Sequence, residues 1–340
     1  MKGKVRQAVI MAGGEGTRLK PLTPVLGRPC IEYTIRSMVS AGVEEVILAL
    51  GYRSQDIKEA LGDGKGLGVE LIYSYEDVPM GTAGSVKLLQ DRLDETFLIG
   101  SGDTLTDADL DDLVDFHFKS GAEATMSLTQ VDHPEQFGIV GTDENGRITR
   151  FKEKPRTEEV FSNVINAGTY VLQRDVLDLV PKNHKWDFSK NLYMDMLAQG
   201  RKLYASTLKG YWKDIGRPSD LLEANLRMAD KVGEPTYVPG AITEGNMVVG
   251  EVACSGAAIT GPAYVGSGSR LSTGSEAISS CLGKDIVLEA EAVVEKCLLL
   301  DGCVIGKGTA LRNTILGKGC KVAAGMVIRD TVAGDGVIFE

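Results

Sequence analysis

Apolar and polar positions alternate in two different ways along the chain. Over roughly residues 1–228, short apolar runs alternate with amphipathic stretches, which predicts a mostly parallel sheet with helices on both faces. A polar turn at 144–146, between two β-type runs, adds a late antiparallel hairpin. The predicted strands are 8–11, 45–50, 70–75, 96–100, 124–131, 138–142 and 148–152. The predicted helices span 54–61, 82–90 and 109–120, and an earlier one has Pro29 at the start of a helical pattern from Ile31.

The pattern after about residue 240 is different, because apolar positions recur there every 17 residues. Three such series, five or six residues apart, predict a coil with three short strands per turn and about five coils. Units such as Val265-Gly-Ser-Gly-Ser resemble the hexapeptide repeat of left-handed parallel β-helices. The alternative is an ordinary glycine-rich sandwich, which would not require three apolar series to share one period. The series are Val248, Val265, Leu282, Leu299 and Leu316; Cys254, Leu271, Leu288, Ile305 and Val322; and Ala277, Val294, Leu311 and Ile328.

A linker separates the two patterns. Gly233-Glu234-Pro235 and Pro239-Gly240 have the composition of connecting segments. We therefore predict one domain over residues 1–232 and a β-helix over residues 233–340. The open coil ends and flat faces of a β-helix favour self-association, so a homo-oligomer is expected.

Composition excludes several classes of protein. A formal charge of −10 argues against nucleic-acid and anionic-membrane partners. No apolar run approaches the roughly 20 residues of a membrane span, and the run that ends at Ala12 is too short for a signal peptide. The six cysteines form no Cys-x-x-Cys pair, which favours a reduced, cytoplasmic setting. Cys303 and Cys320 lie one period apart, within disulfide reach, but reduced thiols are expected.

A glycine-rich stretch follows the first predicted strand. Loops without side chains let backbone N–H groups approach phosphates closely, and an arginine adds a charged fork. The alternative is a tight turn between a strand and a helix. The spacing fits neither the dinucleotide fingerprint nor the P-loop. The candidate nucleotide-binding residues are Ala12, Gly13, Gly14, Gly16 and Thr17, followed by Arg18.

Two aspartates are candidates for a metal site. Asp103 ends an apolar strand in a Gly-Asp pair, and Asp214 lies in Tyr211-Trp212-Lys213-Asp214-Ile215-Gly216. Two carboxylates suit Mg²⁺, which takes phosphate oxygens and waters as its other ligands. The alternative for Asp103 is a turn residue or a helix cap.

Taken in order, these motifs resemble those of the sugar-1-phosphate nucleotidyltransferases over about residues 7–228. The signature is Gly13-Gly14-x-Gly16-Thr17-Arg18-Leu19-x-Pro21-Leu22-Thr23. The resemblance implies a Rossmann-like α/β domain and a metal pair at Asp103 and Asp214. It also implies a sugar phosphate held by Lys154, with Glu153, Asn166 and Gly138 along the sugar. Within the family, mannose-1-phosphate guanylyltransferases with a β-helix are the most similar, and glucose-1-phosphate thymidylyl- and uridylyltransferases are close to them.

Glu76, Gly81 and Thr82 match the segment that reads the base in this family. Guanine offers two adjacent donors that one carboxylate can accept together, whereas thymine and uracil suit an amide better. Glu76 therefore favours guanine, and a surface glutamate ahead of a helix is the alternative.

One segment departs from the family pattern. Members usually have several more residues after Pro-Leu-Thr, including a lysine that contacts the triphosphate. Here Thr23 is followed directly by Pro24-Val25-Leu26-Gly27-Arg28-Pro29. Lys20 keeps the family's spacing back from Pro29 and is the preferred substitute for that lysine. The other possibilities are that Arg28 takes this role or that no residue does.

The implied reaction joins a sugar-1-phosphate and an NTP into an NDP-sugar and pyrophosphate. The sugar phosphate is already an anion and needs no general base, so the protein positions the substrates and neutralises charge. The expected catalytic residues are Arg18, Lys20, Asp103 and Lys154. One alternative is a non-catalytic nucleotide-sugar sensor. Another alternative is a β-helix that transfers acyl groups, a reaction that commonly uses a histidine as the base. It is disfavoured because the chain's three histidines, His117, His133 and His184, all precede the predicted β-helix.

Overall fold

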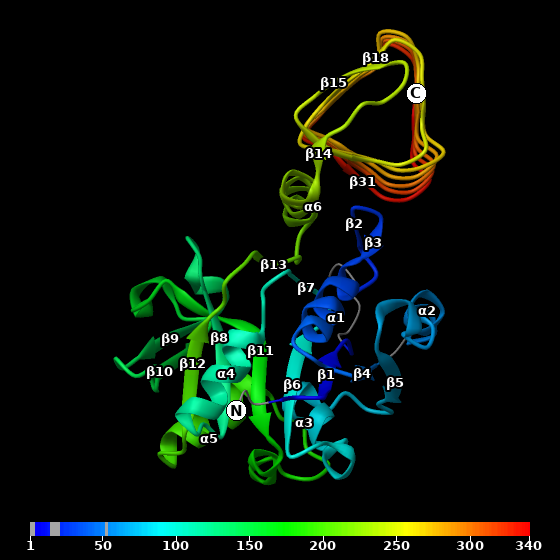
Figure 1. Ribbon diagram of the computed structural model, residues 1–340. Coiled ribbons are helices and arrows are strands. Elements are labelled where there is room, and N and C mark those ends of the chain that lie inside the picture. The colour runs from blue at the N-terminus through cyan, green and yellow to red at the C-terminus, as the bar shows by residue number, and fades with distance from the viewer. Residues whose placement is uncertain (1–3, 14–20, 52–53) are drawn as a thin grey trace. The chain divides into compact units, whose positions relative to one another are not determined.

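The computed structural model describes residues 4–13, 21–51 and 54–340 (Figure 1). Contacts between residues divide the chain into two compact units. The first unit comprises Met1–Leu22 and Cys30–Asp214, and the second comprises Thr23–Pro29 and Ile215–Glu340. In the part of the chain that the structure describes, no helix is both long and apolar enough to cross a membrane.

The first unit is built on one large twisted sheet. Its strands follow the order β10-β9-β11-β6-β1-β4-β5, and β8 and β12 join it beside β11. The central strands β6, β1, β4 and β5 are mutually parallel, whereas β11 runs antiparallel to β6, β8 and β9. The strands are β1 (Gln7–Met11), β4 (Glu45–Leu50), β5 (Glu70–Tyr75), β6 (Thr96–Ser101), β8 (Ala124–Gln130), β9 (Gly138–Thr142), β10 (Ile148–Glu153), β11 (Val164–Gln173) and β12 (Leu203–Thr207).

Helices cover both faces of this sheet, because successive residues of the buried strands point to opposite sides. Val9 of β1 packs in a cluster with residues of α3 and α5, whereas Ile10 packs with residues of α1, α2 and α4. The predicted α/β architecture is confirmed. The helices are α1 (Cys30–Ser40), α2 (Ser54–Leu61), α3 (Gly81–Lys87), α4 (Asp111–Ser120) and α5 (Tyr193–Ala198).

Several element boundaries differ from the predictions, and three of the differences concern the ends of helices. Helix α3 ends at Lys87 rather than at Gln90, where a separate 3₁₀ turn begins. Helix α4 begins at Asp111 rather than at Asp109, because the Asp109 carboxylate accepts the N–H of Asp111. Pro29 belongs to a short strand and does not open α1.

A buried polar network ties α4 to the sheet. His117 is 1% exposed, and its two ring nitrogens lie 2.8 Å from Thr125 Oγ1 and 3.0 Å from Gln173 Nε2. Thr96 Oγ1 in turn donates to Gln173 Oε1. The neutral imidazole thus makes one hydrogen bond at each ring nitrogen. Burial lowers the pKa of His117 to about 4.

This lowered pKa predicts that the first unit loses stability below pH 6.5. An unfolded histidine titrates near 6.5, so between pH 6.5 and about 4 the unfolded state binds more protons than the folded state. The expected loss from pH 7 to pH 5 is about 2 kcal/mol of unfolding free energy. Urea unfolding followed by the fluorescence of Trp186 and Trp212 measures it. His117→Gln should flatten the profile, and an unchanged profile in that variant would refute the assignment.

The second unit combines a hairpin, a helix and a β-helix. The hairpin pairs β2 (Pro24–Val25) with β3 (Arg28–Pro29), and α6 (Pro218–Val232) precedes the β-helix. The β-helix has three sheets that the chain visits in turn, which confirms the predicted left-handed coil of short strands (Figure 1). Their strands pair in parallel except β14, which is antiparallel to β16. Over residues 233–340, all of which are described, two of the sheets contain six strands each, rather than the predicted five or so.

The strands of the three sheets are short and regularly spaced. The first sheet holds β14 (Glu234–Pro235), β16 (Asn246–Val249), β19 (Ala263–Val265), β22 (Cys281–Leu282), β25 (Leu298–Leu299), β28 (Ile315–Leu316) and β31 (Val332–Ala333). The second holds β15 (Ala241–Glu244), β18 (Ala257–Thr260), β21 (Glu276–Ile278), β24 (Val293–Glu295), β27 (Ala310–Arg312) and β30 (Val327–Arg329). The third holds β17 (Ala253–Cys254), β20 (Arg270–Leu271), β23 (Val287–Leu288), β26 (Val304–Ile305), β29 (Lys321–Val322) and β32 (Ile338–Phe339).

The predicted 17-residue register holds for the predicted residues other than Val248. Val249, not Val248, is the partner of Val265, because the first coil is one residue shorter. The prediction for Val248 was therefore wrong. Cys303 and Cys320 are buried free thiols, each 3.1 Å from a backbone carbonyl oxygen. Burial raises the pKa of Cys303 to about 12, so its thiol is inert at neutral pH.

Candidate functional site

The carboxyl ends of three central strands converge at one edge of the first unit's sheet. Ala12 N donates to Ala49 O at 2.9 Å, and Gly102 N donates to Met11 O at 2.9 Å. A side chain on Gly51 would place its Cβ 2.7 Å from Gly13 O. The backbones are therefore packed closely at the edge where open α/β sheets bind their ligands.

The predicted phosphate-binding loop leaves β1 at this edge. Ala12 and Gly13 are half-buried there. The remaining predicted loop residues lie outside the described residues: Gly14, Gly16, Thr17, Arg18 and Lys20.

The two predicted metal ligands lie at the ends of two paired strands. Asp103 lies between β6 and β7 (Thr104–Thr106), and Asp214 ends β13 (Trp212–Asp214). Strands β7 and β13 pair antiparallel with Thr104 opposite Asp214, so Asp103 directly precedes the ladder partner of Asp214. Both side chains are half-buried.

Asp103 and Asp214 both act on the buried thiol of Cys30. This buried thiol has its pKa raised to about 12, first by desolvation and then by the charges of Asp103 and Asp214. Among the described residues, no group of three or more His, Cys, Asp or Glu side chains forms a metal cage. A cation here would thus rely on the two carboxylates and on oxygens of its substrates, as Mg²⁺ does at phosphate sites.

Three hydrogen bonds hold the segments that carry the two aspartates. Thr34 of α1 donates to Thr104 O at 2.9 Å and so fixes the turn that carries Asp103. Ser101 Oγ donates to Asp103 Oδ1 at 2.5 Å. On the other strand, Trp212 Nε1 donates to Ala167 O at 2.7 Å, which attaches β13 to β11.

The residues predicted to hold the sugar phosphate gather on β9, β10 and β11. Gly138 is the β-ladder partner of Glu153, and a side chain on Gly138 would bring its Cβ within 2.7 Å of Glu153 Oε2. Asn166 donates from Nδ2 to Tyr170 Oη at 2.9 Å and to Ser189 Oγ at 3.4 Å. Lys154 has a positive φ of 43° at the end of β10, a rare conformation that is often found at functional sites.

Two further residues of this group carry no motif in the sequence. Ser189 and Lys190 lie on a π-helical turn, Phe188–Leu192, and both act on Glu153. Burial raises the pKa of Glu153, whereas Lys154, Lys190 and a hydrogen bond from Ser189 act in the opposite direction. The π-turn, a form common at functional sites, is the only local signal that could have identified them.

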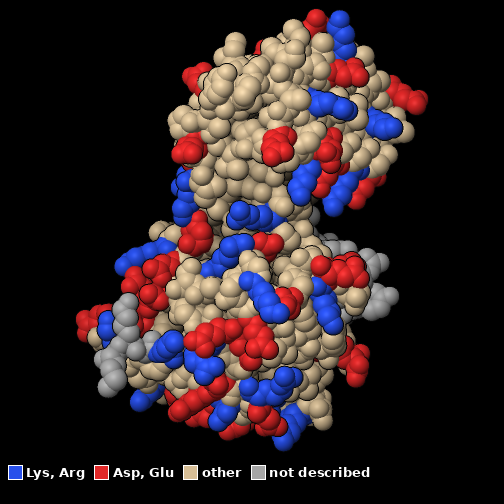
Figure 2. All heavy atoms as spheres, turned by 45° about the vertical axis from the view of Figure 1, so that its right-hand side comes forward, with Lys and Arg blue, Asp and Glu red and all other residues tan. Residues whose placement is uncertain are grey.

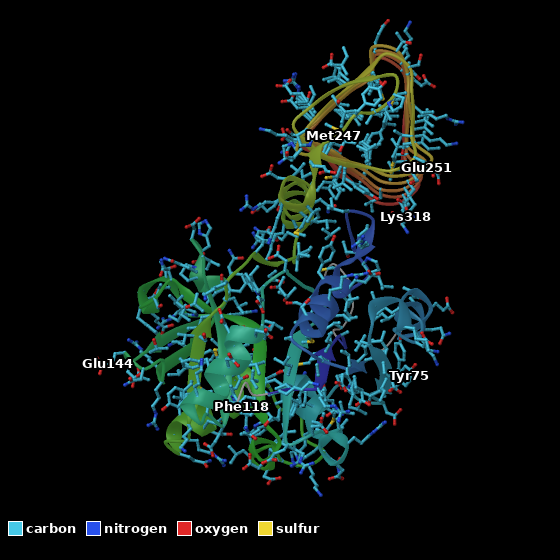
Figure 3. All side chains as sticks on the ribbon, viewed as in Figure 1. Tyr75, Phe118, Glu144, Met247, Glu251 and Lys318 are labelled. Atoms are coloured by element: carbon cyan, nitrogen blue, oxygen red, sulfur yellow. The ribbon has the colours of Figure 1, made fainter. Side chains whose placement is uncertain are left out.

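The predicted base-reading residues lie at the ends of β5 and α3. Glu76 follows β5, and its Oε2 accepts the N–H of Met80 at 3.0 Å. The neighbouring Tyr75 is 51% exposed (Figure 3). Thr82 bonds internally: its N–H donates to Asp187 Oδ1 at 3.2 Å, and its hydroxyl accepts from Phe188 N at 2.9 Å.

Gly81 is required by its backbone. Its φ is +73°, and an added Cβ would lie 2.8 Å from Trp186 O. The structure therefore gives Gly81 and Thr82 a packing role against residues 186–188. The Glu76 carboxylate is half-buried and accepts a hydrogen bond from Met80 N at Oε2.

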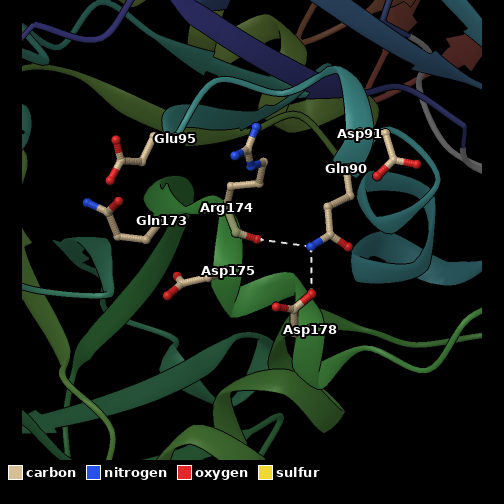
Figure 4. Close-up of a pocket in the computed structure, with 7 residues that line it drawn as sticks. All are labelled: Gln90, Asp91, Glu95, Gln173, Arg174, Asp175 and Asp178. Carbon is tan, nitrogen blue, oxygen red and sulfur yellow. Dashed lines mark hydrogen bonds between the residues drawn. The ribbon is translucent and has the colours of Figure 1, made fainter.

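A cavity of about 560 Å³ lies elsewhere in the first unit, at the amino end of β6 (Figure 4). Four carboxylates and one arginine line it, so it repels the anionic substrates that the motifs imply. The lining residues are Gln90, Asp91, Glu95, Gln173, Arg174, Asp175 and Asp178.

Comparisons with known proteins identify the families of both parts of the chain. Residues 7–231 match the nucleotidyl transferase family, and residues 242–339 match the GlmU-like C-terminal hexapeptide family. The chain is 32% identical over 299 residues to mannose-1-phosphate guanylyltransferase of Mycobacterium tuberculosis, covering 85% of this chain and 83% of that protein. It is 29% identical over 331 residues to UTP–glucose-1-phosphate uridylyltransferase of Synechocystis, covering 90% and 85%.

A solved structure shares the fold of the first unit. The crystal structure of HddC from Yersinia pseudotuberculosis complexed with GMP-PN is 25% identical, with a TM-score of 0.56, and covers 66% of this chain and 100% of that one. The chain therefore belongs to the nucleotidyl transferase family and is a sugar-1-phosphate nucleotidyltransferase followed by a left-handed β-helix.

Proposed function

We propose that the chain transfers GMP from GTP to mannose-1-phosphate. The observation that carries the choice of base is Glu76, a half-buried carboxylate held by Met80 N at the end of β5. A carboxylate accepts both adjacent donors of guanine, N1–H and the 2-amino group. The Mycobacterium tuberculosis relative is named for mannose-1-phosphate and guanylyl transfer, which supports the same pair here.

The donor set at Asp103 and Asp214 fits Mg²⁺. Two half-buried carboxylates, one just before β7 and one at the end of its partner β13, would supply hard oxygen ligands and leave positions for phosphate oxygens. When bound, Mg²⁺ would supply Lewis-acid neutralisation of phosphate charge. Asp103 and Asp214 would hold the ion, and Thr34 and Trp212 would keep these two carboxylates in place.

The other residues would bind and orient the two substrates. Gly13, Gly14, Gly16 and Thr17 would present backbone N–H groups to the triphosphate. Arg18 and Lys20 would neutralise the leaving pyrophosphate. Lys154 would bind the sugar phosphate, and Glu153 and Asn166 would bind sugar hydroxyls. The sugar phosphate oxygen, already anionic, attacks the α-phosphorus, and pyrophosphate departs with the electrons of the broken P–O bond.

Arg28 is a weaker candidate than Lys20 for the missing triphosphate lysine. Its guanidinium lies close enough to Tyr264 of the β-helix to influence the pKa of that phenol. We therefore keep Lys20 in the role.

We further propose that the catalytic work belongs to residues 1–232 and that the β-helix of residues 233–340 mediates self-association. On the face shown in Figure 2, charges of both signs are interspersed, and the second unit carries a broad area without them. Static light scattering of the full chain measures the mass, and a monomer at micromolar concentration would remove the proposal. NTP substrates and the free state of all six thiols are compatible with a cytoplasmic setting.

Glu76→Gln tests the choice of base. The amide would present N–H groups where guanine also donates, and it would suit the carbonyls of uracil. We expect kcat/KM for GTP to fall by roughly 10- to 100-fold while kcat/KM for UTP holds or rises. Glu70→Gln, an exposed position at the start of β5, is the matched control. An unchanged GTP-to-UTP ratio in Glu76→Gln would show that Glu76 does not read the base.

The rival reading is a sensor that binds an NDP-sugar without releasing pyrophosphate. The direct join of Thr23 to Pro24 favours it, because the segment with the family's triphosphate lysine is absent. Glucose-1-phosphate with UTP is the second candidate pair, supported by the name of the Synechocystis relative. Thymidylyl transfer to glucose-1-phosphate is the third.

A further inference from the structure

One side chain connects the two residues that we assign to the sugar hydroxyls. Ser189 is a half-buried residue of the π-helical turn Phe188–Leu192. Its Oγ accepts a hydrogen bond from Asn166 Nδ2 at 3.4 Å. Its hydroxyl donates to the Glu153 carboxylate, and this bond lowers the pKa of Glu153 against the effect of burial. The turn, β10 and β11 therefore meet at the Ser189 hydroxyl.

The hydrogen bonds of Asn166 define what this residue can offer a ligand. A side-chain amide has two N–H donors and an oxygen with two lone pairs. Oδ1 accepts the N–H of Gly168 at 2.9 Å, and a backbone N–H can bond only to the oxygen end of the amide. Nδ2 donates to Tyr170 Oη at 2.9 Å and to Ser189. Both donors are thus used within the protein, and a sugar hydroxyl would meet an acceptor at Asn166.

The backbone that carries Ser189 is held on two sides. The preceding Phe188 is 1% exposed, and its ring centroid lies 5.5 Å from that of Tyr170 and 5.7 Å from that of Tyr193. Phe188 N also donates to Thr82 Oγ1 of α3 at 2.9 Å. Aromatic packing and a hydrogen bond to α3 therefore fix where the Ser189 hydroxyl lies.

We propose that Ser189 is a positioning residue that fixes Glu153 and Asn166 for one sugar ring and so sets the discrimination between sugar-1-phosphates. This inference rests on the proposed role of Glu153 and Asn166 in binding sugar hydroxyls. Epimers differ in the direction of one hydroxyl. A carboxylate and an amide that can turn would meet either epimer, whereas a fixed pair leaves a polar group unpaired with the wrong one.

The main test is Ser189→Ala in the full chain. Pyrophosphate release is measured with mannose-1-phosphate and with glucose-1-phosphate, each varied at saturating GTP and Mg²⁺. We expect the ratio of the two kcat/KM values to fall roughly tenfold, mainly through a higher KM for mannose-1-phosphate. KM for GTP should stay within about twofold of the wild type.

Two further variants make the test specific to the hydroxyl. Ser189→Thr keeps a hydroxyl at this position and should retain most of the discrimination. Ser120→Ala is the matched control, because Ser120 is also half-buried but donates to Phe116 O at 2.8 Å within α4. A purely structural role of Ser189 would lower the melting temperature and raise the KM values of both substrates alike.

Binding provides a second readout that needs no turnover. Titration calorimetry compares GDP-mannose, which carries the sugar, with GDP, which lacks it. Ser189→Ala should raise Kd for GDP-mannose by roughly tenfold and leave Kd for GDP unchanged.

Two results would overturn the inference. One is an unchanged sugar discrimination together with an unchanged Kd for GDP-mannose in folded Ser189→Ala. The other is an equal rise in Kd for GDP-mannose and GDP. A wild type that binds GDP-mannose but releases no pyrophosphate would instead contradict the proposed function, and the calorimetric comparison would still test Ser189. The two failures are therefore distinguishable.

Discussion

Asp103→Asn is expected to abolish turnover while leaving the fold intact. The substitution removes one of two carboxylates but keeps an oxygen that can accept the hydrogen bond from Ser101. Loss of a metal ligand at a phosphoryl-transfer site removes several kcal/mol of charge stabilisation, so kcat should fall by at least about 1,000-fold. Pyrophosphate release at saturating Mg²⁺ measures the loss, and circular dichroism checks the fold.

Two companion variants make this result specific. Asp214→Asn should produce a similar loss, and the double variant should lose little more, because both residues serve one site. Asp109→Asn is the matched control: Asp109 is exposed and only accepts the N–H of Asp111 at the start of α4. Near-normal turnover in Asp103→Asn would remove the metal assignment.

Lys154→Met is expected to raise KM for the sugar-1-phosphate by about 10- to 100-fold. Removing a charged donor to a phosphate costs about 1.5–3 kcal/mol of binding free energy. Both side chains are unbranched, so the left-handed conformation of residue 154 is equally strained before and after the substitution. Steady-state kinetics with the sugar phosphate varied at saturating NTP measure the change.

Lys152→Met is the control for this variant. Lys152 lies two residues earlier on β10, and its ammonium pairs with Glu159 at 2.7 Å. Its loss should leave both KM values unchanged. Equal effects in the two variants would mean that general charge, rather than a specific phosphate contact, governs binding.

Strands and helices were predicted best from the sequence where the spacing of apolar residues matches the side of the element that is buried. The strands β4 and β5 and the helix α2 match their predicted ranges because short apolar runs and amphipathic stretches were bounded by clear breakers. The register of the β-helix followed from its 17-residue spacing, except at Val248. There two adjacent valines left the period ambiguous, and a coil one residue shorter decided for Val249.

Other features depend on long-range contacts that no local pattern reveals. Pro29 looked like the start of a helix, but a hydrogen bond from Leu26 to Asn225, 199 residues away, secures a hairpin there. Ser189 and Lys190 reach Glu153 only because the chain folds residues 186–193 over the end of α3. A polar residue inside α6, such as Asn225, gives no sign in the sequence of what it will bond.

The most direct test of the central claim is pyrophosphate release by the full chain with Mg²⁺. GTP, UTP, dTTP, ATP and CTP are crossed with mannose-1-phosphate, glucose-1-phosphate and N-acetylglucosamine-1-phosphate. The account predicts release with GTP and mannose-1-phosphate well above every other pair. Release with a pair that lacks GTP would contradict the role of Glu76. No release from any pair, by protein that still binds an NDP-sugar, would contradict catalysis itself and establish a nucleotide-sugar sensor.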